Sequence, residues 1–159
     1  MTSRRASRRT VAALAVALTA MLAVTSCVGP SRTRSDFRRK ADTTVDNVRG
    51  AVQTAILGIQ ATDRHSLQAA YVSVLLGDAE EDASAAADTF AGIQPPDERS
   101  DRVRAVTNEL VGESVDALAD ARIVARRGNL AELTPMLPHL RRLARRLERL
   151  SADLDGVGR

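Results

Sequence analysis

The stretch LRRLARRLERLSADL, residues 140–154, decides the fold. Its leucines recur at alternating steps of three and four residues, the spacing that puts side chains on one face of an α-helix. The stripe consists of Leu140, Leu143, Leu147, Leu150 and Leu154. It predicts an amphipathic helix with two alternative beginnings. The helix begins with Asn129 and Glu132 at capping-box spacing and kinks at Pro135 or Pro138, or it starts afresh with Thr134 as cap and Pro135 at its first position.

Three segments before this one carry the same helical spacing. In residues 36–62 the apolar stripe comprises Phe37, Ala41, Val45, Val48, Val52, Ile56 and Ile59. In residues 66–91 it comprises Leu67, Tyr71, Val74, Leu75, Ala79, Ala83, Ala86 and Phe90. In the third segment it comprises Val103, Val106, Leu110, Ala117, Ala121 and Val124. Each stripe predicts a helix with one buried face.

Residues that begin or stop helices mark the ends of these segments. Asp36 can cap the first helix, and the second ends before the two prolines of residues 95–96, which cannot continue a helix. The third begins at Asp97 or Ser100, both suitable N-cap residues, and closes at Gly128. Short turns therefore join the four helices.

The composition favours helix throughout. Ala, Leu and Val supply most of the apolar side chains, aromatic residues make up 2% of the chain, and Ala and Leu are strong helix formers. We predict an all-α, up-down-up-down four-helix bundle over residues 36–155. Gly58, Gly77 and Gly112 fall inside these helices. They indicate either close approach of helices in an Ala-rich core or a kink that shapes a ligand cleft.

Residues 1–26 have the layout of a secretory signal peptide. A basic stretch is followed by an apolar run of 14 residues, Val11 to Val24, and by a small polar ending. The run is shorter than the roughly 20 residues that a membrane-spanning helix needs. We therefore expect a cleaved leader, with an uncleaved membrane anchor as the alternative.

The end of this leader, Val24-Thr25-Ser26-Cys27, resembles the lipobox of bacterial lipoproteins. In that family the cysteine sulfur receives a diacylglycerol and the chain is cut just before it. The resemblance implies that Cys27 becomes a lipidated N-terminus and that residues 27–35 form a short tether. Acylation would also keep the only thiol of the chain from wrong pairing. The alternative is that Cys27 is an ordinary small apolar residue after a conventional cleavage site.

The resemblance also implies a cellular location. The Arg- and Ala-rich, Lys-poor composition resembles that of actinobacterial proteins, and a lipobox followed by a bundle resembles the layout of small helical lipoproteins of that group. Two acyl chains attach a protein durably to a bilayer. We therefore expect a lipid-anchored protein on the extracytoplasmic face of the cell membrane.

The net charge of +3 does not indicate a nucleic-acid binder. Four arginines lie in the leader, and the remaining residues carry 19 basic and 20 acidic side chains. The chain also lacks the interleaved aromatic residues on which bases stack. A basic cluster beyond the tether is either apposed to the membrane or simply solvated. It comprises Arg32, Arg34, Arg38, Arg39 and Lys40.

The densest basic stretch lies in the last helix and comprises Arg141, Arg142, Arg145, Arg146 and Arg149. One interpretation is that these arginines flank the leucine stripe and pair with the acidic helices, since residues 41–120 carry 5 basic and 15 acidic side chains. The other is that they contact an anionic lipid surface or cell-wall polymer. The acidic run of residues 78–82 is either a solvated helix face or a site for a cation or a basic partner.

The sequence contains no motif for metal binding or catalysis. Neither His65 nor His139 follows a Glu by three residues, as carboxylate metal sites of bundles require, and one cysteine cannot form a thiolate zinc site. Gly-rich phosphate loops and the common hydrolase motifs are also missing from the sequence. We expect neither an enzyme nor a cofactor.

These observations favour an envelope lipoprotein that acts as a non-enzymatic interaction or structural module with an envelope protein partner. The alternative is a binding protein for an apolar or anionic ligand. Such a ligand would occupy a cleft between Ala- and Gly-rich helices and use the face of Arg145. The sequence does not indicate the oligomeric state.

Overall fold

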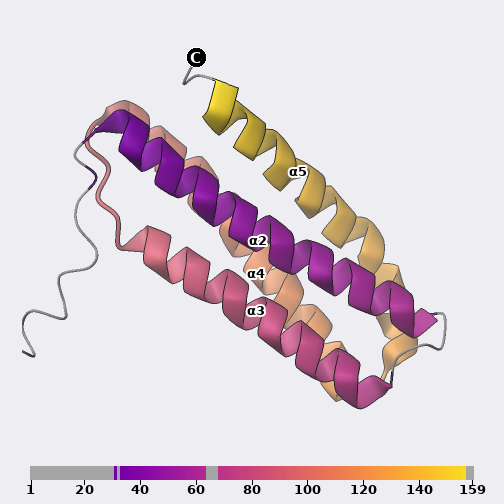
Figure 1. The fold of residues 1–159 in the computed structure, drawn as a ribbon. Helices are drawn as coiled ribbons and strands as arrows, with labels where there is room; N and C mark the ends of the chain where they lie inside the picture. The colour runs from indigo at the N-terminus through magenta and orange to yellow at the C-terminus, as the bar shows by residue number, and fades with distance from the viewer. Residues whose placement is uncertain (1–30, 32, 64–67, 157–159) are drawn as a thin grey trace, which may run out of the picture.

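The structure is a computed structural model that describes residues 31, 33–63 and 68–156 (Figure 1). Its long helices are α2 (Arg34–Asp63), α3 (Ala69–Ala91), α4 (Glu98–Arg126) and α5 (Leu137–Gly156). Two short 3-10 turns, η1 (Leu130–Glu132) and η2 (Thr134–Met136), precede α5. The described residues contain no strand. The prediction of an all-α chain with four helices is confirmed.

The helices form a bundle in which α2 contacts the other three. Its contacts with α3 and α5 are the most extensive, and α3 also packs along α4. The helices α3 and α5 lie on opposite sides of the bundle (Figure 1). None of the described helices is both long enough and apolar enough to cross a membrane.

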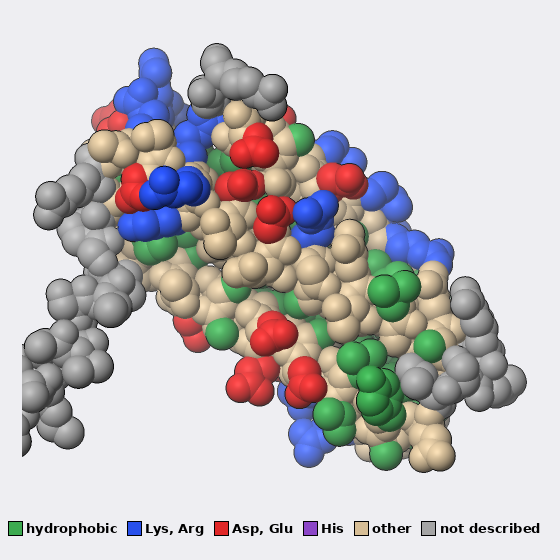
Figure 2. Space-filling model, viewed as in Figure 1, with side chains coloured by type: hydrophobic (Ala, Val, Ile, Leu, Met, Phe, Trp, Pro, Cys, Tyr) green, Lys and Arg blue, Asp and Glu red, His purple; other side chains and the backbone are tan. Residues whose placement is uncertain are grey.

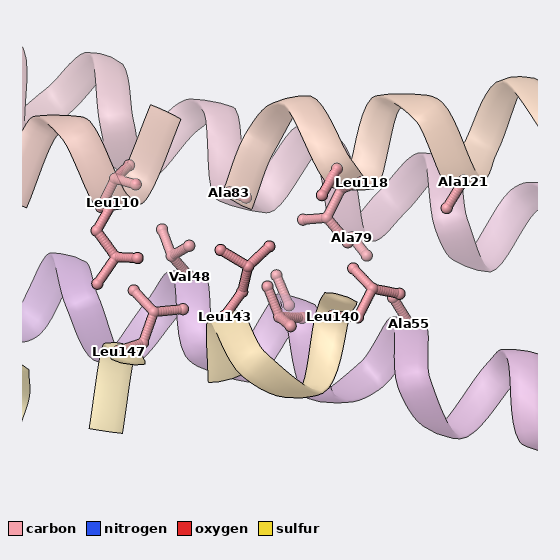
Figure 3. Close-up of a cluster of buried hydrophobic side chains, with 14 of the residues drawn as sticks. Val48, Ala55, Ala79, Ala83, Leu110, Leu118, Ala121, Leu140, Leu143 and Leu147 are labelled. Atoms are coloured by element: carbon pink, nitrogen blue, oxygen red, sulfur yellow. The ribbon is translucent and has the colours of Figure 1, made fainter. Parts of the chain in front are cut away.

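Aliphatic side chains from all four helices fill one core (Figure 3). The stripe predicted for α2 is buried, apart from the half-buried Ile56. On α5, Leu140, Leu143 and Leu147 are fully buried and point toward α2 and α4. Phe37 and Phe90 pack with their ring centroids 5.5 Å apart, where α2 begins and α3 ends. The core therefore holds two of the three aromatic residues, and small aliphatic residues supply the rest.

The stripe predicted for the first half of α3 is wrong. Tyr71 and Val74 are 56% and 61% exposed, whereas Val72 and Leu76 are fully buried. The steps from Val72 through Leu76 to Ala79 are four and three residues, so this set is also a helical stripe. Both sets of residues have helical spacing, and packing against the other helices determines which of them is buried.

The helix ends follow the predicted signals with one change. Thr33, rather than Asp36, caps α2, because its hydroxyl oxygen accepts the Asp36 backbone N–H at 3.1 Å. Asp97 caps α4 by accepting the Ser100 backbone N–H at 2.9 Å. Gly128 has a φ of +76° just beyond α4, a left-handed conformation that favours glycine.

The segment before α5 starts a new helix, as one of the two predictions had it, but the predicted cap is wrong: Thr134 lies inside η2 and no described side chain caps this turn. Pro135 lies at the beginning of η2, and α5 follows from Leu137. Asn129 does not cap the backbone of η1. Its side-chain amide instead donates to the Glu132 carboxylate at 2.6 Å.

Candidate protein-binding surface along α2 and α3

Two hollows follow the line of contact between α2 and α3. The first has a volume of about 680 Å³ and is lined by residues between 39 and 47 of α2 and between 82 and 93 at the end of α3 and beyond. The second, of about 330 Å³, is lined by residues between 46 and 54 of α2 and between 75 and 82 of α3. Asn47 and Asp82 line both hollows. The two hollows therefore form one groove, which we call the α2–α3 groove.

Small side chains leave this groove open. Gly50 and Ala51 line it on α2, and Ala79, Ala85 and Ala86 line it on α3. Such side chains are too short to fill the space between the outer edges of two packed helices. Thr43, Thr44 and Thr89 add hydroxyl groups, each donating its hydrogen to a carbonyl of its own helix. The oxygen of each hydroxyl remains able to accept a further hydrogen bond.

The side chain of Leu75, which lines the groove, lies against Gly58 of α2. A Cβ atom added to Gly58 would overlap the end of the Leu75 side chain, which would have to move to make room. At Gly77 an added Cβ would lie 3.7 Å from the Arg122 side chain, an ordinary contact, and at Gly112 it would meet nothing within 4 Å. Close helix approach was one of the two predictions for these three glycines, and among them it is found at Gly58 alone.

Leu57 and Val74, the chain neighbours of Gly58 and Leu75, are exposed, and together with Tyr71 we define them as the apolar patch. Their exposed fractions are 66%, 56% and 61%. Figure 2 shows apolar side chains gathered over the end of α2 and the beginning of α3. Contiguous apolar surface of this kind marks protein or ligand contacts more often than isolated exposed side chains do.

The free charge of the α2–α3 groove is negative. Asp78 and Asp82 line the groove and make no hydrogen bond or ion pair within the described part of the chain. Arg39 and Lys40, at the other end of the groove, are both held by Asp36, at 2.6 and 3.2 Å. The hydrogen bond from Lys40 is the main cause that lowers the pKa of the Asp36 carboxyl. Asp36 thus partly neutralises these two basic side chains, whereas no described basic side chain neutralises the groove carboxylates Asp78 and Asp82.

The rest of the described basic cluster at the start of α2 is also engaged within the fold. Arg34 donates to Asp97 at 2.6 and 2.9 Å, and Arg38 donates to the backbone carbonyl of Asp153 at 2.9 Å. The Arg34 hydrogen bond, aided by the Ser100 backbone N–H, lowers the pKa of Asp97 to about 2. This cluster therefore holds the ends of helices together, a role that neither sequence interpretation included.

The arginines of α5 differ from this cluster. Arg146 forms a short ion pair with Glu113 of α4. The other four arginines, Arg141, Arg142, Arg145 and Arg149, are exposed and pair with no acidic side chain among the described residues. The prediction that these arginines pair with the acidic helices is correct for Arg146 and wrong for the rest.

The described residues form no cluster of metal-ligating side chains. No three His, Cys, Asp or Glu side chains gather there in a way that could hold a metal ion. His139 lies on α5 with its Nδ1 atom 3.4 Å from the Arg142 guanidinium. His65, Arg32 and the lipobox residues Val24, Thr25, Ser26 and Cys27 lie outside the described residues.

Sequence reasoning missed the apolar patch, and it predicted a cleft between Ala- and Gly-rich helices only as an alternative, without placing it between α2 and α3. Leu57 stood outside the predicted stripe of its helix, and this was the available signal that it is exposed. Tyr71 and Val74 gave no such signal because they fitted a stripe. Comparison of the chain with protein-family models, with curated proteins and with solved structures finds no match.

Proposed function

We propose that this chain is a membrane-anchored envelope lipoprotein that binds a protein partner along α2 and α3 and catalyses no reaction. The observation that carries the proposal is the apolar patch of Leu57, Tyr71 and Val74, which lies on the same two helices as a groove with two carboxylates that no described residue pairs. A groove between two helices is a common seat for an amphipathic helix. The partner segment would be a helix with apolar side chains for the patch and basic side chains for Asp78 and Asp82.

The position of the patch along α2 supports a protein partner. Leu57 lies 23 residues beyond Arg34, the first residue of α2. At 1.5 Å per residue this is about 35 Å along the helix axis. A tether at the beginning of α2 would leave the patch far along the bundle from the point of attachment, where a partner can reach it.

The finer fold that we propose is an up-down-up-down bundle. Three contacts support it. Arg34 pairs with Asp97, so α2 and α4 begin at the same end, and Asp42 binds Ser151, so the end of α5 lies beside the beginning of α2. Gly58 and Leu75 bring the end of α2 beside the beginning of α3.

The lipid anchor that we propose is a diacylglycerol on Cys27. It is supported by the lipobox-like sequence of residues 24–27 after a basic start and a short apolar run. Cells that express the chain should incorporate radiolabelled palmitate into it, and Cys27→Ala should abolish this labelling. A wild-type chain that stays soluble and unlabelled would disprove the anchor.

The partner site is tested by cross-linking and pull-down from native membranes. We expect the double variant Leu57→Ser, Val74→Ser to lose a partner that the wild type captures. Val106→Ser is the matched control, because Val106 is 52% exposed but lies on α4. Circular dichroism establishes that both variants fold. Equal capture by the wild type and the double variant would contradict the proposed site.

The α2–α3 groove supports a second candidate function, the binding of an apolar or anionic ligand between helices. The larger of its two hollows, about 680 Å³, lies within the range of small-molecule sites, about 300 to 1,000 Å³. Arg145 does not line it. If the groove holds such a ligand, a fluorescent fatty acid should bind the wild type, and Thr43→Trp should weaken its binding. Saturable binding that this variant leaves unchanged would exclude the groove.

A further inference from the structure

We propose that the exposed arginines of α5 lay the bundle on its side on an anionic phospholipid surface, with α3 turned away from the bilayer. The inference rests on the proposed membrane anchor, which brings the bundle to such a surface. It adds an orientation and a second point of membrane contact. We define the arginine face as Arg141, Arg142, Arg145 and Arg149.

The arginine face lies opposite the leucine stripe of α5. Arg141, Arg145 and Arg149 follow one another at steps of four residues, which places them along one side of the helix. Leu143 and Leu147, on the other side, are fully buried. All four arginines of the face are exposed. Figure 2 shows basic side chains in a row along the edge of the molecule that α5 forms.

The positive charge of the arginine face is not neutralised by ion pairs with the described residues. Arg142 approaches His139, and no acidic side chain among the described residues pairs with Arg141, Arg145 or Arg149. The exposed Glu148 lies at one edge of the face and lowers its net charge by one. The face therefore differs from the basic cluster at the start of α2, which binds Asp36, Asp97 and a backbone carbonyl.

The opposite side of the bundle has the opposite charge. The helix α3 carries five acidic residues and no basic one. Its exposed acidic side chains are Asp78, Glu81, Asp82 and Asp88. An anionic surface attracts the α5 side and repels the α3 side, so charge alone sets one orientation. This orientation keeps the apolar patch and the groove carboxylates accessible to a protein partner.

The chemistry of the arginine face fits phosphate groups better than a protein or a nucleic acid. None of the exposed large apolar side chains lies on α5, whereas the centre of a protein interface is apolar. No aromatic side chain lies on α5 to stack with a base. Arginine guanidinium groups bind phosphate oxygens in a bidentate way. A phospholipid surface presents many phosphates in one plane, and an extended row of arginines can contact several of them at once.

The test uses the chain from residue 28 onward, which lacks the lipid but keeps every core residue, since these lie between Phe37 and Leu154. We expect it to co-sediment with vesicles of equimolar phosphatidylglycerol and phosphatidylcholine, and not with phosphatidylcholine alone. High salt should release it. The triple variant Arg141→Gln, Arg145→Gln, Arg149→Gln should bind on the order of 100-fold more weakly, at about fivefold for each arginine.

A control variant removes the same number of charges elsewhere. Arg99→Gln, Arg102→Gln and Arg126→Gln remove three exposed arginines of α4 that form no ion pair within the described residues. We expect this variant to bind the vesicles nearly as the wild type does. An equal loss in both triple variants would show that net charge, rather than the arginine face, causes binding, and would overturn the proposal.

The orientation is tested with a dye on a single introduced cysteine, since the chain from residue 28 has none. Ala152→Cys places the dye among the arginines of α5, and Ala85→Cys places it on the exposed surface of α3. A quencher carried by the lipid headgroups should quench the dye at position 152 strongly and the dye at position 85 weakly. Equal quenching at both positions would overturn the sideways orientation.

Other partners of the arginine face give distinct outcomes. Binding to a soluble polyanion without binding to the vesicles would overturn the proposal, as would self-association that the α5 variant abolishes. The lipid anchor is judged separately by palmitate labelling. A chain that takes up no palmitate but binds the anionic vesicles through α5 refutes the anchor and retains the arginine face.

Discussion

Asp97 joins two helix ends with a single carboxylate. One oxygen caps α4 by accepting from the Ser100 backbone and hydroxyl, and the other accepts from Arg34 at the beginning of α2. These donors favour the charged form, so the pKa of Asp97 falls from 3.8 to about 2. The sequence indicated the cap but not Arg34, which lies 63 positions away.

We predict a pH-dependent stability difference between the wild type and Asp97→Asn. Asparagine retains a capping oxygen but loses the charge. Since the folded-state pKa is depressed, the contribution of the charge is fully present above pH 3.8 and is lost as the pH falls toward about 2. Urea unfolding at a series of pH values should show the two midpoints converging over this interval. A gap that is constant between pH 3.8 and 2 would contradict the assigned pKa.

The glycines of α2 and α4 should respond differently to alanine. Gly112→Ala should raise the free energy of unfolding by about 0.5–1 kcal/mol, because helix propensity improves and nothing lies within 4 Å. Gly58→Ala should raise the free energy of unfolding by a smaller amount, because the Leu75 side chain must move. Combining Gly58→Ala with Leu75→Ala removes this obstacle. The alanine at position 58 should then stabilise relative to Leu75→Ala alone, and denaturant unfolding measures the cycle.

At the scale of the element, α5 is the most clearly amphipathic of the helices. Its leucines are buried against α2 and α4, and its arginines face outward. The apolar and basic faces of this helix do not overlap, and the predicted burial of Leu140, Leu143 and Leu147 is confirmed. The helix therefore contributes both to the core and to the charge of the surface.

We predict that Leu143→Ala lowers the free energy of unfolding by about 3 kcal/mol, because Leu143 is fully buried and its loss leaves a cavity. Leu57→Ala is the control. Leu57 is 66% exposed, so its truncation should change stability by no more than about 0.5 kcal/mol. Chemical denaturation of both variants gives the comparison. Similar losses would mean that Leu57 is buried by a contact such as self-association.

The helices α3 and α4 show where periodicity alone is ambiguous. Alanines occupy much of α3, and several sets of residues have helical spacing there. Tyr71 and Val74 fitted one set, whereas the structure buries Val72 and Leu76. On α4 the predicted Val106 is 52% exposed, and its neighbour Thr107 is fully buried instead.

At the scale of the whole molecule, the three surfaces lie on two different sides of the bundle. The apolar patch and the α2–α3 groove lie on one side, and the arginine face lies on α5, across the bundle from α3 (Figure 1). The described basic residues at the start of α2 are bound within the fold. This separation of charge would let one bundle contact a bilayer and a protein at the same time.

The proposed topology predicts a specific cross-link. Ser151 donates to Asp42 at 2.7 Å, which places the last turns of α5 beside the first turns of α2. In a chain lacking Cys27, cysteines at positions 42 and 151 should be joined by a short bis-thiol reagent. The pair Asp42→Cys and Arg126→Cys should not react, because Arg126 ends α4 far along the bundle. Efficient reaction of the second pair, without reaction of the first, would refute the up-down-up-down order.

The candidate surface was only partly accessible to sequence reasoning. The acidic run of residues 78–82 was recognised as a possible contact for a basic partner, and Asp78 and Asp82 do line the groove. The groove itself depends on how Gly50 and Ala51 of α2 face Ala79 and Ala85 of α3. Such pairing depends on the rotation of one helix against another, which no single helical stripe specifies.

The sequence by itself determined the helical class and the buried stripes of α2 and α5, because apolar spacing and helix-stopping residues act locally. The tertiary structure decided which face of α3 is buried, that among the described residues only Arg146 of the α5 arginines pairs with an acidic side chain, and that Leu57, Tyr71 and Val74 are exposed. The physical reason is that burial and ion pairing depend on neighbours distant in the chain. A helix can satisfy its own backbone hydrogen bonds in any rotation, and only packing selects one.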